Sequence, residues 1–180
     1  MIILVKGRQR TGKTTVVIGI GLYLVLECGY STSDIVSNIR LYHEDGTELK
    51  EYYYLTNKQM KLYVKIMVEK GLKHKIIIID EIDRVFSHRF WSNKEQAEAL
   101  LGLWQDEKLF NWIIGTAHLG RSVDNLIRES CQIEIIAEID KPANVVDLTI
   151  LNALDLNVYE DVMYNARLVQ SLFKSWDPVV

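Results

Sequence analysis

Cysteine is scarce in this 180-residue chain, which has only two, Cys28 and Cys131. They are far apart and lack the spacing of a metal-binding pair. The scarcity argues against a metal site built on cysteine. It predicts two buried thiols in a protein of a reducing compartment.

Long hydrophobic runs are also missing. The first apolar run stops at Lys6, so no signal peptide is expected, and the next, Val16–Leu26, has 11 residues. A membrane-spanning helix needs roughly 20 apolar residues. We therefore expect no transmembrane segment and a cytoplasmic protein.

Charge of one sign is not in large excess either. The formal net charge is −3, so bulk electrostatics do not favour nucleic-acid binding, and any contact with DNA must be local. A hydrophobic share of 48% with 25% charged residues is that of a globular protein. The length is most simply one domain over residues 1–180.

A phosphate-binding loop is present near the start of the chain. The sequence GRQRTGKT lies between the apolar stretch MIILV and the apolar run VVIGIGLYLVL, and it fits the pattern G-x-x-x-x-G-K-[ST]. The backbone N–H groups of such a loop face one anion. The predicted nucleotide-binding residues are Gly7, Arg8, Gln9, Arg10, Thr11, Gly12, Lys13, Thr14 and Thr15.

Three of these residues have predicted individual roles. Lys13 would reach the β- and γ-phosphates, Thr14 would ligate Mg²⁺, and Thr15 would contact the α-phosphate. The loop therefore predicts nucleoside triphosphate binding without saying how the energy is used.

A second chemical site follows the run of isoleucines in IIIIDEID. The run predicts a buried strand that delivers Asp80 to its carboxyl end, where open α/β sheets bind ligands. Asp80 would hold Mg²⁺ opposite Thr14. Glu81 follows directly and suits a general base that orients water, which favours hydrolysis.

A third polar segment follows the predicted strand FNWIIGT. If this strand lies between the loop strand and the Asp80 strand, its end points at the γ-phosphate, with Thr116 and His118 as candidate sensors. Transition-state charge also calls for a cation, often from a neighbouring subunit. The candidate arginines are Arg84, Arg89, Arg121 and Arg128, with Arg89 and Arg121 preferred.

Strands and helices alternate along the rest of the chain. Predicted strands cover 34–42, 48–55, 75–80, 110–116, 131–139 and 145–151, with a hairpin turn at 44–47. Predicted helices cover 14–27, 56–69, 92–108, 123–129 and 164–174. This order predicts an α/β fold with a mainly parallel central sheet flanked by helices and a more antiparallel C-terminal edge.

Taken together, these segments resemble the FtsK–HerA group of P-loop ATPases, and more narrowly the Zot-like ATPases and viral genome-packaging ATPases. The likeness is carried by GRQRTGKT, by IIIIDEIDRVF and, more softly, by WIIGTAHLGRSVDNLIRES and MYNARLVQSLF. The resemblance implies a P-loop NTPase fold of the RecA/FtsK type. His118 departs from the glutamine sensor that is common in such ATPases.

The resemblance also implies a function and partners. It implies a ring, expected to be a hexamer, that uses ATP and Mg²⁺ to move double-stranded DNA, with capsid or membrane-vesicle proteins of a virion as further partners. Related phage proteins continue into a membrane segment, whereas this chain ends at Val180 without one. That favours a packaging motor over an export protein.

A basic segment offers a local DNA contact. Residues 56–75 contain six lysines and one acid, a local charge of +5. Lys58, Lys61 and Lys65 have the spacing of one helix face and would contact phosphates. A solvated helix face explains the same pattern.

Two other functions remain open. Thymidine kinases pair a phosphate loop with an Asp-Glu strand, but this chain has no cysteine pairs for their zinc-bearing lid. The other alternative is a non-motor ATPase that acts as a switch or assembly adaptor. DNA-stimulated turnover distinguishes the motor from the adaptor.

Overall fold

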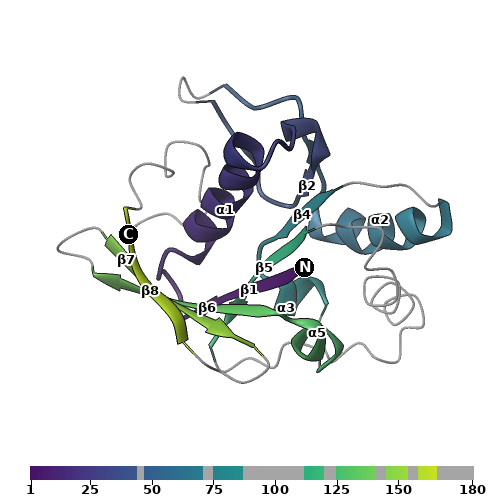
Figure 1. Ribbon diagram of the computed structural model, residues 1–180. Coiled ribbons are helices and arrows are strands. Elements are labelled where there is room, and N and C mark those ends of the chain that lie inside the picture. Colours follow the sequence, from purple (N-terminus) through teal and green to yellow (C-terminus); the bar gives the residue numbers. More distant parts are fainter. Residues whose placement is uncertain are drawn as a thin grey trace.

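The central element is an eight-stranded sheet with the order β3-β2-β4-β5-β1-β6-β7-β8 (Figure 1). The computed structural model describes residues 1–43, 47–70, 75–86, 112–119, 125–140, 145–153 and 158–165. The strands are β1 (Ile2–Gly7), β2 (Ile35–Ser37), β3 (Tyr53–Tyr54), β4 (Ile76–Ile79), β5 (Trp112–His118), β6 (Ile133–Asp140), β7 (Val145–Asn152) and β8 (Val158–Asn165).

In the parallel part of the sheet, β5 lies between β1 and β4. This is the strand order under which Thr116 and His118 were expected to point at the γ-phosphate. In the register, Val5 lies opposite Thr116, and Ile79 lies opposite Gly115. The carboxyl ends of β1, β4 and β5 therefore meet at one edge of the sheet. All four residues of β4 are buried, as expected for a strand covered on both faces.

The C-terminal edge is antiparallel, which confirms the predicted fold class. β6 pairs antiparallel with β7, and β7 pairs antiparallel with β8. The predicted helix from Tyr164 is wrong at its start, because Tyr164 and Asn165 belong to β8. Pairing with β7 decides this segment's structure, and the remainder of that predicted helix lies outside the described residues.

The predicted hairpin over 34–55 is also wrong. β2 and β3 pair in parallel, and the hairpin is reduced to an isolated antiparallel bridge between Tyr42 and Glu48. Backbone groups that a hairpin would pair with a neighbouring strand are hydrogen-bonded here by the side chain of Tyr52. The Tyr52 hydroxyl accepts the Leu41 N–H at 2.9 Å and donates to the Ile39 carbonyl at 3.3 Å. Of the predicted turn, residues 44–46 lie outside the described residues.

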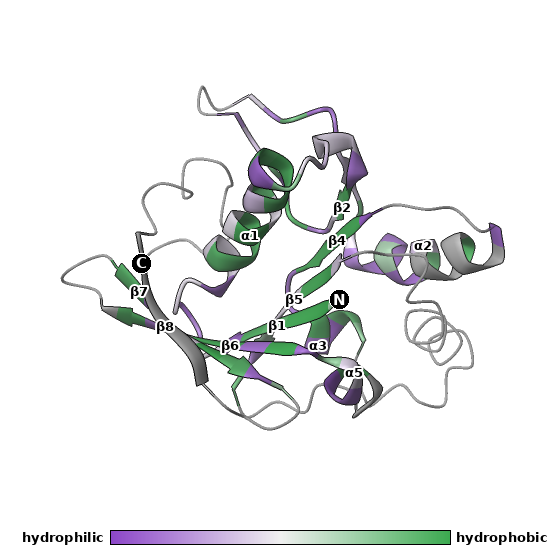
Figure 2. Ribbon diagram, viewed as in Figure 1, coloured by the Kyte–Doolittle hydropathy of each residue, from purple (hydrophilic) through white to green (hydrophobic). Residues whose placement is uncertain are grey.

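Helices cover both faces of the sheet (Figure 1). α1 (Lys13–Glu27) packs on one face with Val16, Val17 and Ile18, while α2 (Asn57–Lys70), α3 (Ile82–Val85) and α5 (Asn125–Ser130) lie on the other. A short 3₁₀ turn, η1 (Thr32–Asp34), precedes β2. In Figure 2 the central strands and much of α1 carry the apolar colour expected of the core. The predicted helix over 92–108 lies outside the described residues.

Two remaining expectations concern cysteines and membranes. Cys131 is buried as predicted, but Cys28 is exposed beyond the end of α1, so that part of the prediction is wrong. Within the part of the chain that the structure describes, no helix has the length and apolar character needed to cross a membrane.

Candidate functional site

The loop between β1 and α1 is shaped by its two glycines. Gly12 has φ +81°, and a Cβ on it would lie 2.6 Å from Cγ2 of Val146. A Cβ on Gly7 would lie 2.6 Å from the Ala137 carbonyl oxygen. Only glycine fits these two positions without strain or clash. The close approach of β6 and β7 therefore explains the glycines that the motif requires.

Lys13 is the first residue of α1 and points back over the loop. Its Nζ donates to the Arg8 carbonyl at 2.6 Å, and the Thr11 hydroxyl donates to the same carbonyl at 3.0 Å. Burial lowers the pKa of Lys13, and the nearby carboxylates of Asp80, Asp83 and Glu81 oppose that shift. The ammonium therefore lies in a cradle that suits an added anion.

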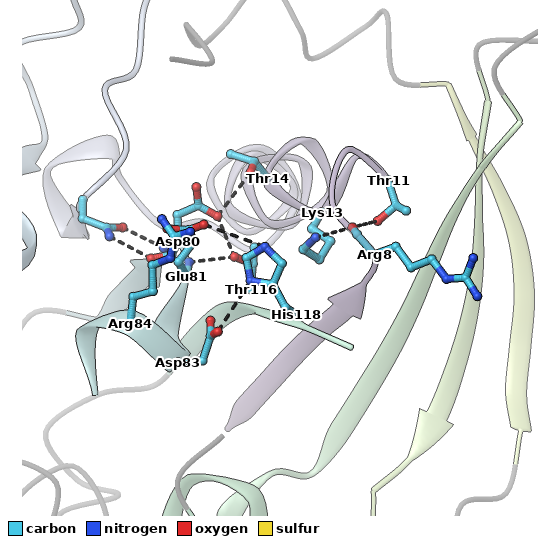
Figure 3. A network of polar contacts seen from close by, with 11 residues as sticks. Arg8, Thr11, Lys13, Thr14, Asp80, Glu81, Asp83, Arg84, Thr116 and His118 are labelled. Carbon is cyan, nitrogen blue, oxygen red and sulfur yellow. Dashed lines mark hydrogen bonds and ion pairs between the residues drawn. The ribbon is translucent and has the colours of Figure 1, made fainter. Parts of the chain in front are cut away.

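Asp80 follows β4 and lies opposite Thr14. The Thr14 hydroxyl donates to Oδ1 of Asp80 at 3.2 Å, and the Thr116 hydroxyl donates to the same oxygen at 2.5 Å. The structure thus brings together the two predicted metal ligands, Thr14 from the start of α1 and Asp80 from the end of β4 (Figure 3).

Glu81 has the left-handed backbone conformation, with φ +52°, at the turn from β4 into α3. Non-glycine residues rarely adopt it, and such positions cluster at functional sites. The Glu81 N–H donates to the Thr116 hydroxyl at 2.8 Å. Its carboxylate oxygen Oε2 is 2.7 Å from NH1 of Arg84, one turn along the chain.

His118 ends β5 beside these acids. Its Nε2 is 3.8 Å from Oε1 of Glu81, and its Nδ1 is 3.5 Å from Oδ2 of Asp83. Figure 3 shows the ring between the two carboxylates. Asp83 had no assigned role in the sequence-based prediction, because nothing local links it to a histidine that follows another strand.

Asn38 is a second residue that sequence reasoning missed. Its side chain bonds both backbone groups of Asp80: Oδ1 accepts the N–H at 2.7 Å, and Nδ2 donates to the carbonyl at 2.9 Å. Nδ2 also donates to Oδ1 of Asn57, at the start of α2, at 2.7 Å. The available signal was a polar asparagine in the middle of the predicted strand 34–42. It marks the end of the strand, because β2 ends at Ser37, just before Asn38.

Other predicted site residues lie farther out or outside the described part. Arg8, Gln9 and Arg10 are exposed, and the Arg8 side chain points away from Asp80 (Figure 3). Thr15 is buried on α1. Arg84 and Arg128 are exposed, whereas Arg89 and Arg121 lie outside the described residues. Lys58 and Lys61 lie on α2, Lys58 exposed and Lys61 half-buried, and the Lys65 side chain is not described.

The donor set at Thr14 and Asp80 fits Mg²⁺ bound with a nucleotide. No cluster of three or more histidine, cysteine or acidic side chains suited to a metal is found within the described residues. Mg²⁺ characteristically takes one or two carboxylates and completes its shell with water and phosphate oxygens. One hydroxyl and one carboxylate therefore suffice, provided that phosphate is also present.

Comparison with known proteins agrees with this geometry. The model of the "ATPase family associated with various cellular activities (AAA)" matches residues 3–140. The chain belongs to this family. It is therefore a P-loop ATPase that binds ATP, and its β1 loop and β4 lie within the matched region. The curated proteins with which the sequence was compared gave no match.

Two solved structures share the fold. The N-terminal domain of zonular occludens toxin from Neisseria meningitidis has a TM-score of 0.60 at 14% identity, over 96% of this chain and 98% of that one. The genome packaging NTPase B204 from Sulfolobus turreted icosahedral virus 2 has a TM-score of 0.56 at 11% identity, over 91% and 95%. B204 was solved with sulfate and with ATP-gammaS. The resemblance noted from the sequence is thus confirmed in the fold.

Proposed function

We propose that this ATPase depends on Mg²⁺ and powers the translocation of double-stranded DNA, most specifically the packaging of a viral genome into a capsid. The observation that carries the ATPase part is the meeting of Lys13, Thr14, Asp80 and Glu81 at one sheet edge. The fold shared with a genome packaging NTPase supports the DNA part.

In this proposal the loop and the end of β4 bind the nucleotide. Loop N–H groups and the Lys13 ammonium hold the β- and γ-phosphates, while Thr14 and Asp80 hold Mg²⁺. When bound, Mg²⁺ would neutralise charge that develops on the phosphates. Lys13 would exchange its contact with the Arg8 carbonyl for phosphate oxygens.

Glu81 is the proposed general base. Its carboxylate takes a proton from water, the water oxygen bonds to the γ-phosphorus, and the bond to the bridging oxygen of ADP breaks. The left-handed turn directs Glu81 off the end of β4 beside Asp80, where such a base is needed. Thr116 and Asn38 hold the backbone of these two acids in place.

The proposed partners follow from this assignment. A ring of copies, most simply a hexamer, would let a neighbour supply an arginine, for which Arg89 and Arg121 stay candidates. Arg84 is a weaker one, because it pairs with Glu81 of its own chain. Lys58, Lys61 and Lys65 of α2 would contact DNA phosphates. The motor would act in the host cytoplasm or at a virion, with capsid or vesicle proteins as partners.

The second candidate is a non-motor ATPase that acts as a switch or assembly adaptor. The fold shared with the N-terminal domain of zonular occludens toxin, and not with a packaging NTPase alone, favours keeping it. In this case hydrolysis would be slow and indifferent to DNA. A nucleoside kinase is less favoured, because the sequence has no cysteine pairs for the zinc-bearing lid of thymidine kinases.

The test is steady-state ATP hydrolysis by the purified protein with and without double-stranded DNA, in a salt series and with Mg²⁺ removed by EDTA. We expect turnover that needs Mg²⁺ and rises with DNA in a salt-sensitive way. Lys13→Ala should weaken ATP binding. Turnover indifferent to DNA at every salt concentration would reject the motor and leave the adaptor.

A further inference from the structure

Asp83 is a buried carboxylate that the hydrolysis scheme does not use. It lies in the first turn of α3, and its side chain is 2% exposed. Removing a carboxylate from water is costly unless charged or hydrogen-bonding groups compensate. The groups that face Asp83 therefore bear on its role.

His118 is one such group. Nδ1 of its imidazole is buried and lies 3.5 Å from Oδ2 of Asp83, on the side of the ring away from Glu81, in a contact slightly longer than a formed hydrogen bond. A carboxylate beside one ring nitrogen sets the orientation of the ring and the nitrogen that carries the proton. The opposite nitrogen, Nε2, then faces Glu81.

We infer that Asp83 is a positioning residue for the proposed ATP hydrolysis, on which this inference rests. Its carboxylate holds the His118 ring with a protonated Nδ1 towards itself and so presents Nε2 beside Glu81. The 3.8 Å between Nε2 and Oε1 of Glu81 exceeds a direct hydrogen bond, but one water in contact with both groups spans it. Asp83 thus acts on the water through His118.

This role depends on the imidazole. A glutamine at the end of β5 has a fixed donor and a fixed acceptor, and it needs no partner to choose its protonation. An imidazole exchanges between two tautomers, so an orienting carboxylate restricts it to one. The effect of removing Asp83 should therefore vanish once His118 is replaced.

The experiment is a double-mutant cycle with Asp83→Asn, His118→Gln and both together, in steady-state ATP hydrolysis. Asp83→Asn should lower kcat about tenfold or more. KM for ATP should change less than about twofold. In the His118→Gln protein, Asp83→Asn should cost nothing further. A second cycle uses Asp83→Leu in place of Asp83→Asn, because the asparagine amide can still accept a hydrogen bond from His118 and leucine cannot.

Glu134→Gln is the matched control. Glu134 pairs with Lys6, and their side chains are 16% and 17% exposed, close to the 17% of His118. Losing this pair removes a carboxylate from the same sheet without touching His118. Glu134→Gln should therefore change the melting temperature of the protein and leave kcat for ATP hydrolysis unchanged.

A second readout needs neither activity nor an Asp83 variant. Nitrogen-15 spectra of the wild-type imidazoles, with His118→Gln to assign the signal among four histidines, should show a proton on Nδ1 of His118. An unprotonated Nδ1, or an equal loss of kcat from Asp83→Asn in both backgrounds, overturns the inference. A wild-type protein without turnover would refute the proposed function instead, and the spectrum would then decide alone whether Asp83 holds His118.

Discussion

Oγ1 of Thr116 lies 2.5 Å from Oδ1 of Asp80, and the same hydroxyl accepts the backbone N–H of Glu81 at 2.8 Å. One fully buried side chain on β5 therefore holds both acids at the end of β4. The parallel register, which sets Gly115 opposite Ile79, fixes this contact. Thr116 thus links the proposed metal ligand to the proposed base.

Thr116→Val should impair both stability and turnover. Valine keeps the shape but leaves the Glu81 N–H without this acceptor in a partly buried site. The free energy of unfolding should fall by about 1–3 kcal/mol. Urea unfolding and steady-state ATP hydrolysis measure the two effects. Thr116→Ser, which keeps the hydroxyl, is the control, and a valine variant as stable and active as wild type would contradict this role.

Glu81→Gln should bind ATP but not hydrolyse it. The amide keeps the size of the side chain and cannot accept a proton from water, so kcat should fall by about 10²–10⁴. Fluorescent nucleotide binding and phosphate release measure the two steps separately. Glu48→Gln, which breaks the exposed pair with Arg40, is the control for loss of a carboxylate. Wild-type turnover in Glu81→Gln would remove Glu81 from the base role.

The features that sequence predicted well are those that short segments encode. The glycine loop, the buried run Ile76–Ile79 and the acids after it need only their neighbours in the chain to be read. Their meeting at one edge follows from the rule that parallel strands present their carboxyl ends together. For this reason the sequence alone predicted that Lys13, Thr14, Asp80 and Glu81 lie together, while their roles in ATP hydrolysis stay predictions.

The features that sequence missed depend on partners distant in the chain. β8 is a strand because β7 offers it a ladder, and β3 joins β2 in parallel although a hairpin signal separates them. Asn38 bonds the backbone of a residue 42 positions away. Pairings of this kind leave no periodic trace in the sequence.

Replacing the lysines of α2 tests the proposed DNA contact. Lys58→Ala with Lys61→Ala should reduce DNA-stimulated turnover and leave basal turnover unchanged. If each lysine contacts one phosphate, each loss flattens the salt dependence of DNA affinity by a slope of about 0.9. Lys50→Ala, which removes an exposed lysine outside α2, is the control. If the salt dependence of DNA affinity is the same in the double variant as in the wild type, the lysine face of α2 is in contact with solvent and not with DNA.

The two cysteines should react at very different rates. Burial raises the pKa of Cys131 to about 11, whereas Cys28 is exposed. At pH 8 the Cys131 thiolate is then about one part in a thousand. A thiol reagent should label Cys28 rapidly and Cys131 only after denaturation. Rapid labelling that survives Cys28→Ser would show that Cys131 is accessible.

The same pKa shift predicts a loss of stability at alkaline pH. The thiol's ordinary value of 9.0 applies in the unfolded chain, so between pH 9 and about 11 the folded state holds a proton that the unfolded state has released. The stabilisation is therefore full below pH 9 and declines as pH rises towards 11. Urea unfolding at several pH values measures this decline. Cys131→Ala should lower the free energy of unfolding, because it leaves a cavity, but that free energy should decline less steeply with pH than in the wild type. An equally steep decline in Cys131→Ala would assign the pH dependence to other groups. One such group is Tyr63, because burial raises its pKa to about 12.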